Sequence, residues 1–252
     1  MIKKHLLTCS VILVVAVIFE LNICSTTDMI PAKKSTLTSK FIFTNNAAAT
    51  TFSFANEALP VNNADVNRKM RITLLQHNFR NIHSNILHIK AERLFPIIEP
   101  ILRLYGIPDD FKYLPLVESG LNEGTSLKGA TGLWQFMPGT ARTYGLKVGK
   151  GIDERRNVRK STIAACRYIK DLYHQFNSWT LAAAAYNNGE IKLAKAMNKQ
   201  SHATYFNTHF NRETGDYVYN ILAMKEIILS PAKYGYDYVY NIVPVAKLLV
   251  YN

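Results

Sequence analysis

The sequence predicts an all-α protein, and three features support that class. Apolar residues recur at three- and four-residue spacings through residues 67–228, which is the pattern of amphipathic helices. The four alanines at 182–185 suit a helix that packs closely in the centre of a domain. The chain has 252 residues, 48% of them hydrophobic, so it has enough apolar side chains for one ordinary domain with appendages.

Residues 1–25 have the composition of a secretory signal peptide. Lys3 and Lys4 give a positive start, and the apolar run 11–19 is shorter than the roughly 20 residues that a membrane-spanning helix needs. We therefore expect an exported protein of the periplasm or cell envelope. An uncleaved membrane anchor is the alternative. A lipid on Cys24 is disfavoured, because Ile23 stands where that processing needs a small residue.

Residues 26–65 are rich in Ser, Thr, Asn and Ala without sustained periodicity, so we expect a low-complexity tether. The runs Phe41–Phe43 and Phe52–Phe54 within it could dock on the domain. Residues 66–106 are expected to form an N-terminal helical segment, with one helix over 67–90 and a second, Pro-interrupted helix over 91–105. The predicted inward stripes are Ile72, Leu75, Phe79, Ile82 and Ile86 in the first helix, and Leu94, Ile98, Ile101 and Tyr105 in the second.

An acid stands within the apolar face of the next predicted helix, over residues 111–121. Side chains three and four positions apart share a helical face, so Glu118 joins Phe111, Leu114 and Leu121. Pro115 should bend this helix or confine it to a short piece. A carboxyl group in apolar surroundings tends to keep its proton, because the ionised form loses its hydration. Glu118 is therefore the candidate general acid.

A glycine loop follows the acid. Gly129 and Gly132 allow a tight turn and a close approach of a ligand to the backbone. Trp134 and Gln135 follow at once, and an aromatic plane beside an amide is a common way to hold a sugar and its N-acetyl group. Pro138 predicts the start of the next helix.

Two further helices and a tail complete the prediction. The clearest helix follows the charged turn 151–157, and its expected buried face is Thr162, Ala165, Cys166, Ile169, Leu172, Tyr173 and Phe176. Cys166 is interpreted as a core residue rather than a nucleophile. Ser178 should cap a small-residue helix over 179–186. The aromatic tail 236–252 is expected to form a short strand or to cap the domain.

Three blocks of this sequence resemble the signature blocks of the lytic transglycosylase SLT domain. They are Glu118–Ser119, Gly132–Gln135 and Ala185–Gly189, and they occur in the family's order and spacing. The stretch Leu114–Ser119 is similar to the membrane-bound murein transglycosylase D branch. The resemblance covers residues 91–235 and implies a lysozyme-like helical catalytic domain over 107–235.

The resemblance also implies an activity and a set of site residues. It implies cleavage of the β-1,4 bond between N-acetylmuramic acid and N-acetylglucosamine in peptidoglycan. Glu118 would act first as acid and then as base, leaving 1,6-anhydro-muramoyl ends. The substrate-binding residues that we predict are Ser119, Ser126, Gly132, Trp134, Gln135, Tyr186, Asn187 and Tyr217. Tyr217 has an equal alternative as a core tyrosine, because Ile221, Met224 and Ile228 continue its stripe.

No second catalytic carboxylate is marked by the family's blocks. Ordinary glycosidases need two, whereas substrate-assisted enzymes are an exception. The other acids that could serve are Glu123, Asp153, Glu154, Glu190 and Glu213. A lysozyme-type muramidase on the same fold is therefore one alternative function, and a non-catalytic cell-wall-binding protein is another.

The formal net charge of +12 indicates an acidic partner. Together with the signal peptide it favours a wall polymer or an anionic membrane over nucleic acid, so peptidoglycan is the expected partner. We predict no metal and no cofactor, since the chain lacks a phosphate loop and a zinc signature, and His77, His83 and His88 lack the i, i+4 spacing of helical metal ligands. The oligomeric state is left open, with a monomer expected.

Overall fold

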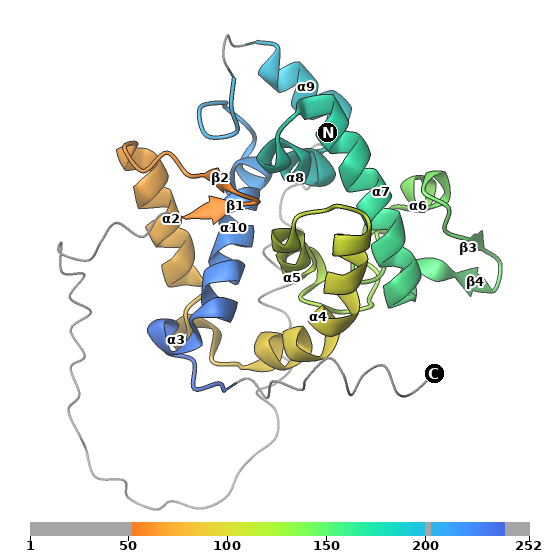
Figure 1. Cartoon of the computed structure of the whole chain (residues 1–252), viewed down its shortest axis with the longest axis horizontal. Coiled ribbons are helices and arrows are strands. Elements are labelled where there is room, and N and C mark those ends of the chain that lie inside the picture. Colours follow the sequence, from red (N-terminus) through yellow and green to blue (C-terminus); the bar gives the residue numbers. More distant parts are fainter. Residues whose placement is uncertain (1–51, 200–202, 240–252) are drawn as a thin grey trace, which may run out of the picture. The chain divides into compact units, whose positions relative to one another are not determined.

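A computed structural model describes residues 52–199 and 203–239, which belong to one compact unit. The predicted signal peptide and residues 26–51 of the predicted tether lie outside the described residues. The described part of the chain is built from helices with two short antiparallel hairpins, so the all-α class is confirmed (Figure 1). No helix in that part combines the length and hydrophobicity that crossing a bilayer requires.

The elements up to the candidate acid are β1 (Ser53–Phe54), β2 (Glu57–Ala58), α2 (Ala64–Gln76), α3 (Phe79–Ile82), α4 (Ile86–Leu104), the 3-10 helix η1 (Asp109–Tyr113) and α5 (Leu114–Ser119). Those after it are α6 (Pro138–Thr143), β3 (Val148–Gly149), β4 (Ile152–Asp153), η2 (Glu154–Arg156), α7 (Val158–Phe176), α8 (Trp179–Asn188), α9 (Glu190–Met197), α10 (Arg212–Leu229) and η3 (Pro231–Tyr234).

The tether prediction is wrong for residues 52–65. Here β1 and β2 form a hairpin, and α2 begins at Ala64 behind its N-cap Asn63. Phe54 is fully buried and packs edge-on against Phe111, with ring centroids 5.0 Å apart. Glu57 reaches the start of α8, where Oε1 and Oε2 accept from the backbone N–H of Trp179 and Thr180 at 2.5 and 2.9 Å. The polar composition of this segment gave no sign of a hairpin, because the hairpin is stabilised by contacts with residues far along the chain.

The first predicted helix is also corrected. The single helix predicted over residues 67–90 is divided into α2, α3 and the start of α4. Between α3 and α4, His83 adopts a left-handed conformation with φ +53°. Ile72 and Leu75, predicted to face inward, are 47% and 45% exposed. The buried face of α2 is instead Val66, Met70 and Thr73, which have an equally helical spacing and meet α10.

The second predicted helix is longer than expected. A single α4 runs from Ile86 to Leu104 with Pro96 and Pro100 inside it. Ile98 and Ile101 are buried as predicted, whereas Leu94 and Tyr105 are half-buried against the core.

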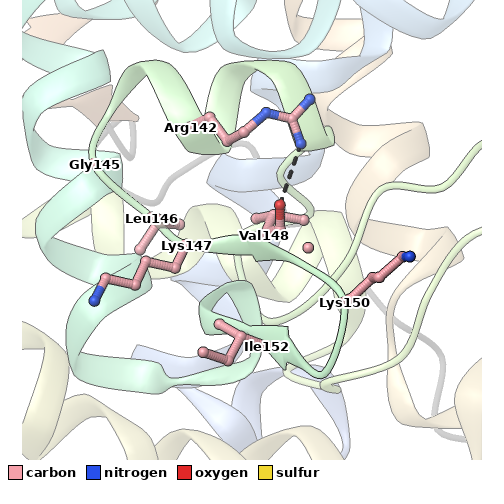
Figure 2. Close-up of a pocket in the computed structure, with 8 residues that line it drawn as sticks. Arg142, Gly145, Leu146, Lys147, Val148, Lys150 and Ile152 are labelled. Atoms are coloured by element: carbon pink, nitrogen blue, oxygen red, sulfur yellow. Dashed lines mark hydrogen bonds between the residues drawn. The ribbon is translucent and has the colours of Figure 1, made fainter.

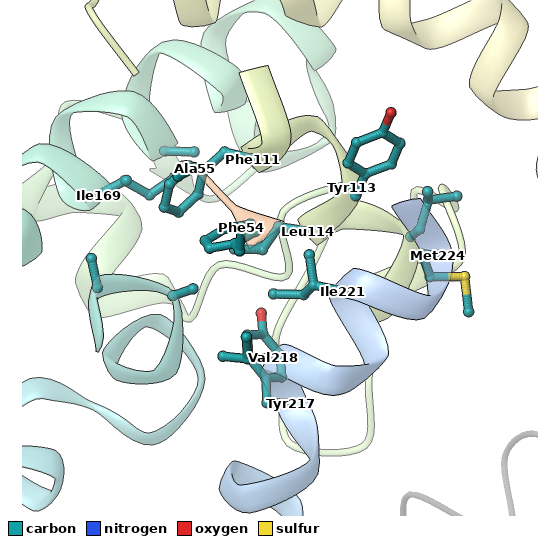
Figure 3. Close-up of a cluster of buried hydrophobic side chains, with 14 of the residues drawn as sticks. Phe54, Ala55, Phe111, Tyr113, Leu114, Ile169, Tyr217, Val218, Ile221 and Met224 are labelled. Carbon is teal, nitrogen blue, oxygen red and sulfur yellow. The ribbon is translucent and has the colours of Figure 1, made fainter. Parts of the chain in front are cut away.

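The core forms where α5, α8 and α10 meet the N-terminal hairpin. Figure 3 shows Phe54, Phe111 and Leu114 facing Ile221 and Val218 of α10. The four alanines of α8 are fully buried, as the close-packed helix required.

The helix α7 also agrees with its prediction. Its stripe from Thr162 to Leu172 is buried, with Tyr173 and Phe176 half-buried at its end. Cys166 is fully buried, which raises the pKa of its thiol to about 12, so its assignment to the core is confirmed.

The described part of the tail caps the domain. Tyr236 is buried against Phe79 and His88, with ring centroids 5.4 and 4.6 Å away. Residues 236–239 form no strand. Residues 240–252 lie outside the described residues.

Candidate active site

Glu118 lies near the end of the short helix α5. Pro115 stands in the first turn of this helix, so the prediction of a short helical piece is confirmed. Its stripe partners Phe111, Leu114 and Leu121 are buried, whereas Glu118 itself keeps partial access to solvent. Burial of the carboxyl raises the pKa of Glu118 to about 7, opposed by a hydrogen bond from Tyr217 and assisted by the charge of Glu213. The carboxyl group thus combines an elevated pKa with partial exposure of the residue.

Tyr217 comes from α10 and meets the acid directly. Its hydroxyl donates a hydrogen bond to Glu118 Oε1. The ring is 3% exposed within the core stripe of α10, and burial raises the pKa of the hydroxyl well above its usual value. The core alternative for Tyr217 is therefore confirmed, and the hydroxyl of this core residue contacts the candidate acid.

Ser119 ties α5 to the glycine loop. Its Oγ lies 2.9 Å from the carbonyl oxygen of Leu133 and 3.1 Å from that of Pro115, and it accepts from the N–H of Asn122 at 3.2 Å. The Ser119 hydroxyl therefore contacts the backbone of α5 and that of the glycine loop. Ser126 lies in a turn, where its Oγ accepts from the N–H of Ala130 at 3.1 Å.

Gly132 is required by a close backbone approach. It has φ +81°, and a Cβ at this position would lie 2.0 Å from the carbonyl oxygen of Arg155. The group that approaches Gly132 closely is therefore the protein's own chain, whereas the sequence analysis expected a ligand there.

The prediction that Trp134 stacks on a sugar is wrong. The residue is fully buried, and its Nε1–H donates to Thr162 Oγ1 of α7 at 2.9 Å. A large apolar ring beside an amide suits a binding platform and a core anchor equally well, and here the ring anchors the loop to α7.

Gln135 and Tyr186 both bond to backbone carbonyl groups of the glycine loop. Gln135 is in the left-handed region with φ +47°, and its side-chain amide donates to the carbonyl oxygens of Gly132 and Gly124 at 2.8 and 3.3 Å. Tyr186, from α8, donates its hydroxyl to the carbonyl oxygen of Trp134 at 2.8 Å. The pKa of Tyr186 is raised well above its usual value, by burial first and then by the charge of Glu118. Tyr186 thus lies near the acid while its hydroxyl bonds to the loop.

Asn187 links the end of α8 to the start of α10. Its Nδ2 donates to Glu213 Oε1 at 3.4 Å, and its Oδ1 accepts from Thr214 Oγ1 at 3.5 Å. Among the predicted site residues, the structure brings Glu118, Tyr186, Asn187 and Tyr217 together from three helices.

A residue beside the site that the sequence analysis missed is Arg155. It is 7% exposed, and its Nη1 donates to the carbonyl oxygens of Gly129 and Phe136 at 2.8 and 2.9 Å. Asp153 pairs with it at 2.7 Å. The charged turn 151–157 was visible in the sequence, but nothing there indicated that one of its arginines is buried beneath the glycine loop.

The other acids considered for a second catalytic role are placed differently. Asp153 pairs with Arg155, and the pKa of Asp153 is lowered by that contact. Glu154 pairs with Lys160 at 2.5 Å, and Glu190 accepts from Tyr168 at 3.4 Å. Glu213 is the acid of this set whose charge acts on Glu118.

A separate hollow of about 510 Å³ lies between α6 and the β3–β4 hairpin (Figure 2). It is lined in part by Arg142, Lys147 and Lys150, and the two lysine side chains extend in opposite directions. It shares no lining residue with the Glu118 site. Over the described ranges no group of three His, Cys, Asp or Glu side chains is arranged to hold a metal ion.

Comparison with known proteins relates this site to one family. The model of the transglycosylase SLT domain matches residues 96–208. The chain is 36% identical over 154 residues to membrane-bound lytic murein transglycosylase D of Escherichia coli strain K12, covering 58% of this chain and 34% of that protein. It is 34% identical over 94 residues to a putative tributyltin chloride resistance protein of Alteromonas sp. strain M-1, covering 36% of this chain and 45% of that protein.

Among solved structures, an inactive mutant of the lytic transglycosylase Slt from Pseudomonas aeruginosa matches with a TM-score of 0.43 and 24% identity, over 54% of this chain and 24% of that chain. The chain thus spans less than half the length of the relatives it matches. The matched segment begins within α4 and ends before α10, so it includes Glu118 and Tyr186 but not Tyr217. The resemblance drawn from the three sequence blocks is confirmed by the match of the transglycosylase SLT domain model to residues 96–208.

Proposed function

We propose that this chain is a lytic transglycosylase that cleaves the β-1,4 bond between N-acetylmuramic acid and N-acetylglucosamine in peptidoglycan. The observation that carries the proposal is the carboxyl group of Glu118, whose pKa of about 7 keeps much of it protonated at neutral pH within an SLT domain. A general acid works best when its pKa lies near the working pH. The curated relative named a lytic murein transglycosylase supports the same activity.

In the proposed reaction Glu118 acts twice. Its protonated form gives a proton to the glycosidic oxygen as the bond to C1 of the muramoyl residue breaks. The N-acetyl carbonyl of that sugar supports the positive charge at C1, so a second carboxylate is not needed. The Glu118 carboxylate then takes the proton of the C6 hydroxyl, and that oxygen closes on C1. The products are a free N-acetylglucosamine hydroxyl and a 1,6-anhydro-muramoyl end, with no water consumed.

Tyr217 and the loop residues have supporting roles in this proposal. The Tyr217 hydroxyl stabilises the Glu118 carboxylate that forms after the first proton transfer, because it donates to Oε1. The remaining sugar contacts are assigned to Gln135, Asn187 and Ser126, which are partly exposed. The N-terminal helices brace the catalytic domain from behind, and the protein works in the periplasm or cell envelope.

Product analysis tests the proposal. Purified protein is incubated with peptidoglycan sacculi, and the released muropeptides are analysed by mass spectrometry. We expect anhydro ends, which are lighter by one water than the reducing ends of a hydrolase. Reducing ends alone would establish the muramidase alternative.

The Glu118→Gln variant tests the assigned acid. Turnover should fall by roughly 100-fold or more, the range that general acid–base catalysis supplies. Glu123→Gln, in the exposed loop after α5, is the matched control and should retain activity. Full turnover by the Glu118 variant would refute the mechanism, and loss in the Glu123 variant would favour a two-carboxylate hydrolase.

A further inference from the structure

Glu213 is an exposed carboxylate at the start of α10, beside the proposed acid. It precedes Tyr217 by four residues, so both side chains lie on one face of the helix. Because Tyr217 donates to Glu118, this face is directed toward the acid, and Glu213 lies one turn closer to the helix N-terminus. Asn187 holds the carboxylate from the end of α8 through the 3.4 Å hydrogen bond.

Glu213 has no ion-pair partner among the described residues, although the chain carries 30 Lys and Arg. The basic side chains nearby pair with Asp216 instead, Lys69 at 2.8 Å and Arg212 at 3.7 Å. An unpaired carboxylate beside a second carboxyl group costs electrostatic energy whenever both are ionised. The arrangement therefore favours the state in which one of the two carries a proton.

The charged and titratable groups that face Glu118 come from several elements. Tyr217 and Glu213 come from α10, and Tyr186 comes from α8. Lys90 of α4 approaches the end of α5, where its Nζ lies 3.4 Å from the carbonyl oxygen of Gly120 and also bonds to Asn122. The two tyrosines are neutral at physiological pH, because the pKa of each hydroxyl is raised well above its usual value. Glu213 is then the group in this set that contributes a negative charge.

We infer that Glu213 is a positioning residue of the site, where its carboxylate, held by Asn187, adds charge repulsion to the effect of burial and so favours the protonated form of Glu118. The role of Glu213 in catalysis rests on the proposed function. It matters there because a general acid must carry its proton when it meets the substrate. Glu213 itself exchanges no proton with the sugar. Its exposure also implies that dissolved salt weakens the effect.

Carbon-13 NMR titration of the Glu carboxyl groups tests this inference without substrate. The Glu118 signal is assigned by its disappearance in Glu118→Gln, and its midpoint is then measured in the wild-type protein and in Glu213→Gln. We expect the midpoint to move to lower pH in Glu213→Gln, because the repulsion is removed while the size of the side chain is kept. The difference from wild type should shrink between 0.01 and 1 M NaCl, as the Debye length falls from about 30 to about 3 Å.

Glu190→Gln is the matched control, because Glu190 also lies in the first turn of a helix and its charge is not among those acting on Glu118. It should leave the Glu118 midpoint unchanged. An unchanged or raised midpoint in Glu213→Gln would overturn the inference, and so would an equal shift in Glu190→Gln.

The activity profile distinguishes this inference from the proposed function. If the chain is a transglycosylase, the pH at which activity declines should move down in Glu213→Gln in step with the NMR midpoint. Loss of activity at every pH, with the midpoint unmoved, would instead mean that Glu213 contacts substrate, and would overturn the positioning role. A shifted midpoint in a protein that releases no muropeptide would refute the function while leaving the electrostatic role of Glu213 established.

Discussion

Glu118 experiences three effects that change its pKa in different directions. Burial of its carboxyl raises the pKa most, the hydrogen bond from Tyr217 lowers it, and the charge of Glu213 raises it, with a result of about 7. A raised pKa in the folded state means that folding favours the protonated form. The stability contributed by this protonation is complete below the usual pKa of about 4.5 and is lost as pH rises through about 7.

Replacing Glu118 with Gln should therefore stabilise the protein at alkaline pH. A shift from 4.5 to about 7 corresponds to roughly 3 kcal/mol, as an upper limit, since each pKa unit is worth about 1.4 kcal/mol. We expect the variant to be more stable than wild type in urea at pH 8 and equally stable at about pH 3, well below the usual pKa. Equal stability at both pH values would show that the carboxyl is fully hydrated.

Tyr217→Phe should affect the pH dependence as well as the rate. Loss of the donor leaves the Glu118 carboxylate less stable, so the pKa of Glu118 rises and the alkaline decline in activity moves to higher pH. Hydrogen bonds to charged groups contribute about 1.5–3 kcal/mol, so the maximal rate should fall roughly tenfold or more. Tyr219→Phe is the control, because Tyr219 is a buried tyrosine of the same helix whose ring lies 4.9 Å from Lys69 Nζ. A pH profile that moves to the same extent in both variants would contradict the role of Tyr217.

At the scale of elements, the path of the glycine loop is set by contacts with the protein's own residues beneath it. Arg155 donates to Gly129 and Phe136, Trp134 is anchored on α7, and Ser119 bonds to Leu133. These contacts fix the path of the backbone beside Glu118. The left-handed conformation of Gln135 belongs to this fixed path.

Alanine substitutions in the loop separate backbone conformation from close packing. Gly132 and Gly129 both have positive φ, +81° and +85°, but an added Cβ would strike Arg155 only at Gly132 and would meet nothing within 4 Å at Gly129. Gly129→Ala should cost about 1–2 kcal/mol from its left-handed conformation. Gly132→Ala should cost about 1–3 kcal/mol more from overpacking. Urea denaturation measures both, and equal losses would show that the contact with Arg155 is relaxed at no cost.

At the scale of the whole molecule, the described unit extends well beyond the matched SLT segment. The hairpin β1–β2 precedes that segment and α10 follows it, yet both contribute to one core (Figure 3). Lys225 of α10 joins them, because its Nζ donates to the carbonyl oxygen of Ser53 at 2.9 Å and pairs with Asp110 at 2.8 Å. The segment 96–208 alone would lack Tyr217 and the inner face of α10.

Glu57→Ala tests whether the N-terminal hairpin stabilises the domain at a distance. Its carboxylate accepts from two N–H groups at the start of α8 and from Ser178 Oγ at 2.7 Å. Loss of such a cap should cost about 1–2 kcal/mol. Glu190→Ala, whose side-chain contact is the 3.4 Å bond from Tyr168, should cost much less. Comparable free energies of unfolding for the two variants would show that the hairpin is dispensable.

The sequence by itself determined the helical class, the short α5, the buried faces of α7 and α8, and Glu118 as the candidate acid. Each depends on spacing or residue type within one segment, and such local information is complete in the sequence. Only the tertiary structure decided that Trp134 is buried, that Arg155 supports the loop, that the hairpin at residues 53–58 joins the core, and that Asn187 bonds to Glu213. These placements depend on which segments of the chain meet. In α2, the stripe with Val66 and Met70 and the stripe with Ile72 and Leu75 have similar helical spacing, and only the packing of another helix against the first stripe shows which one is buried.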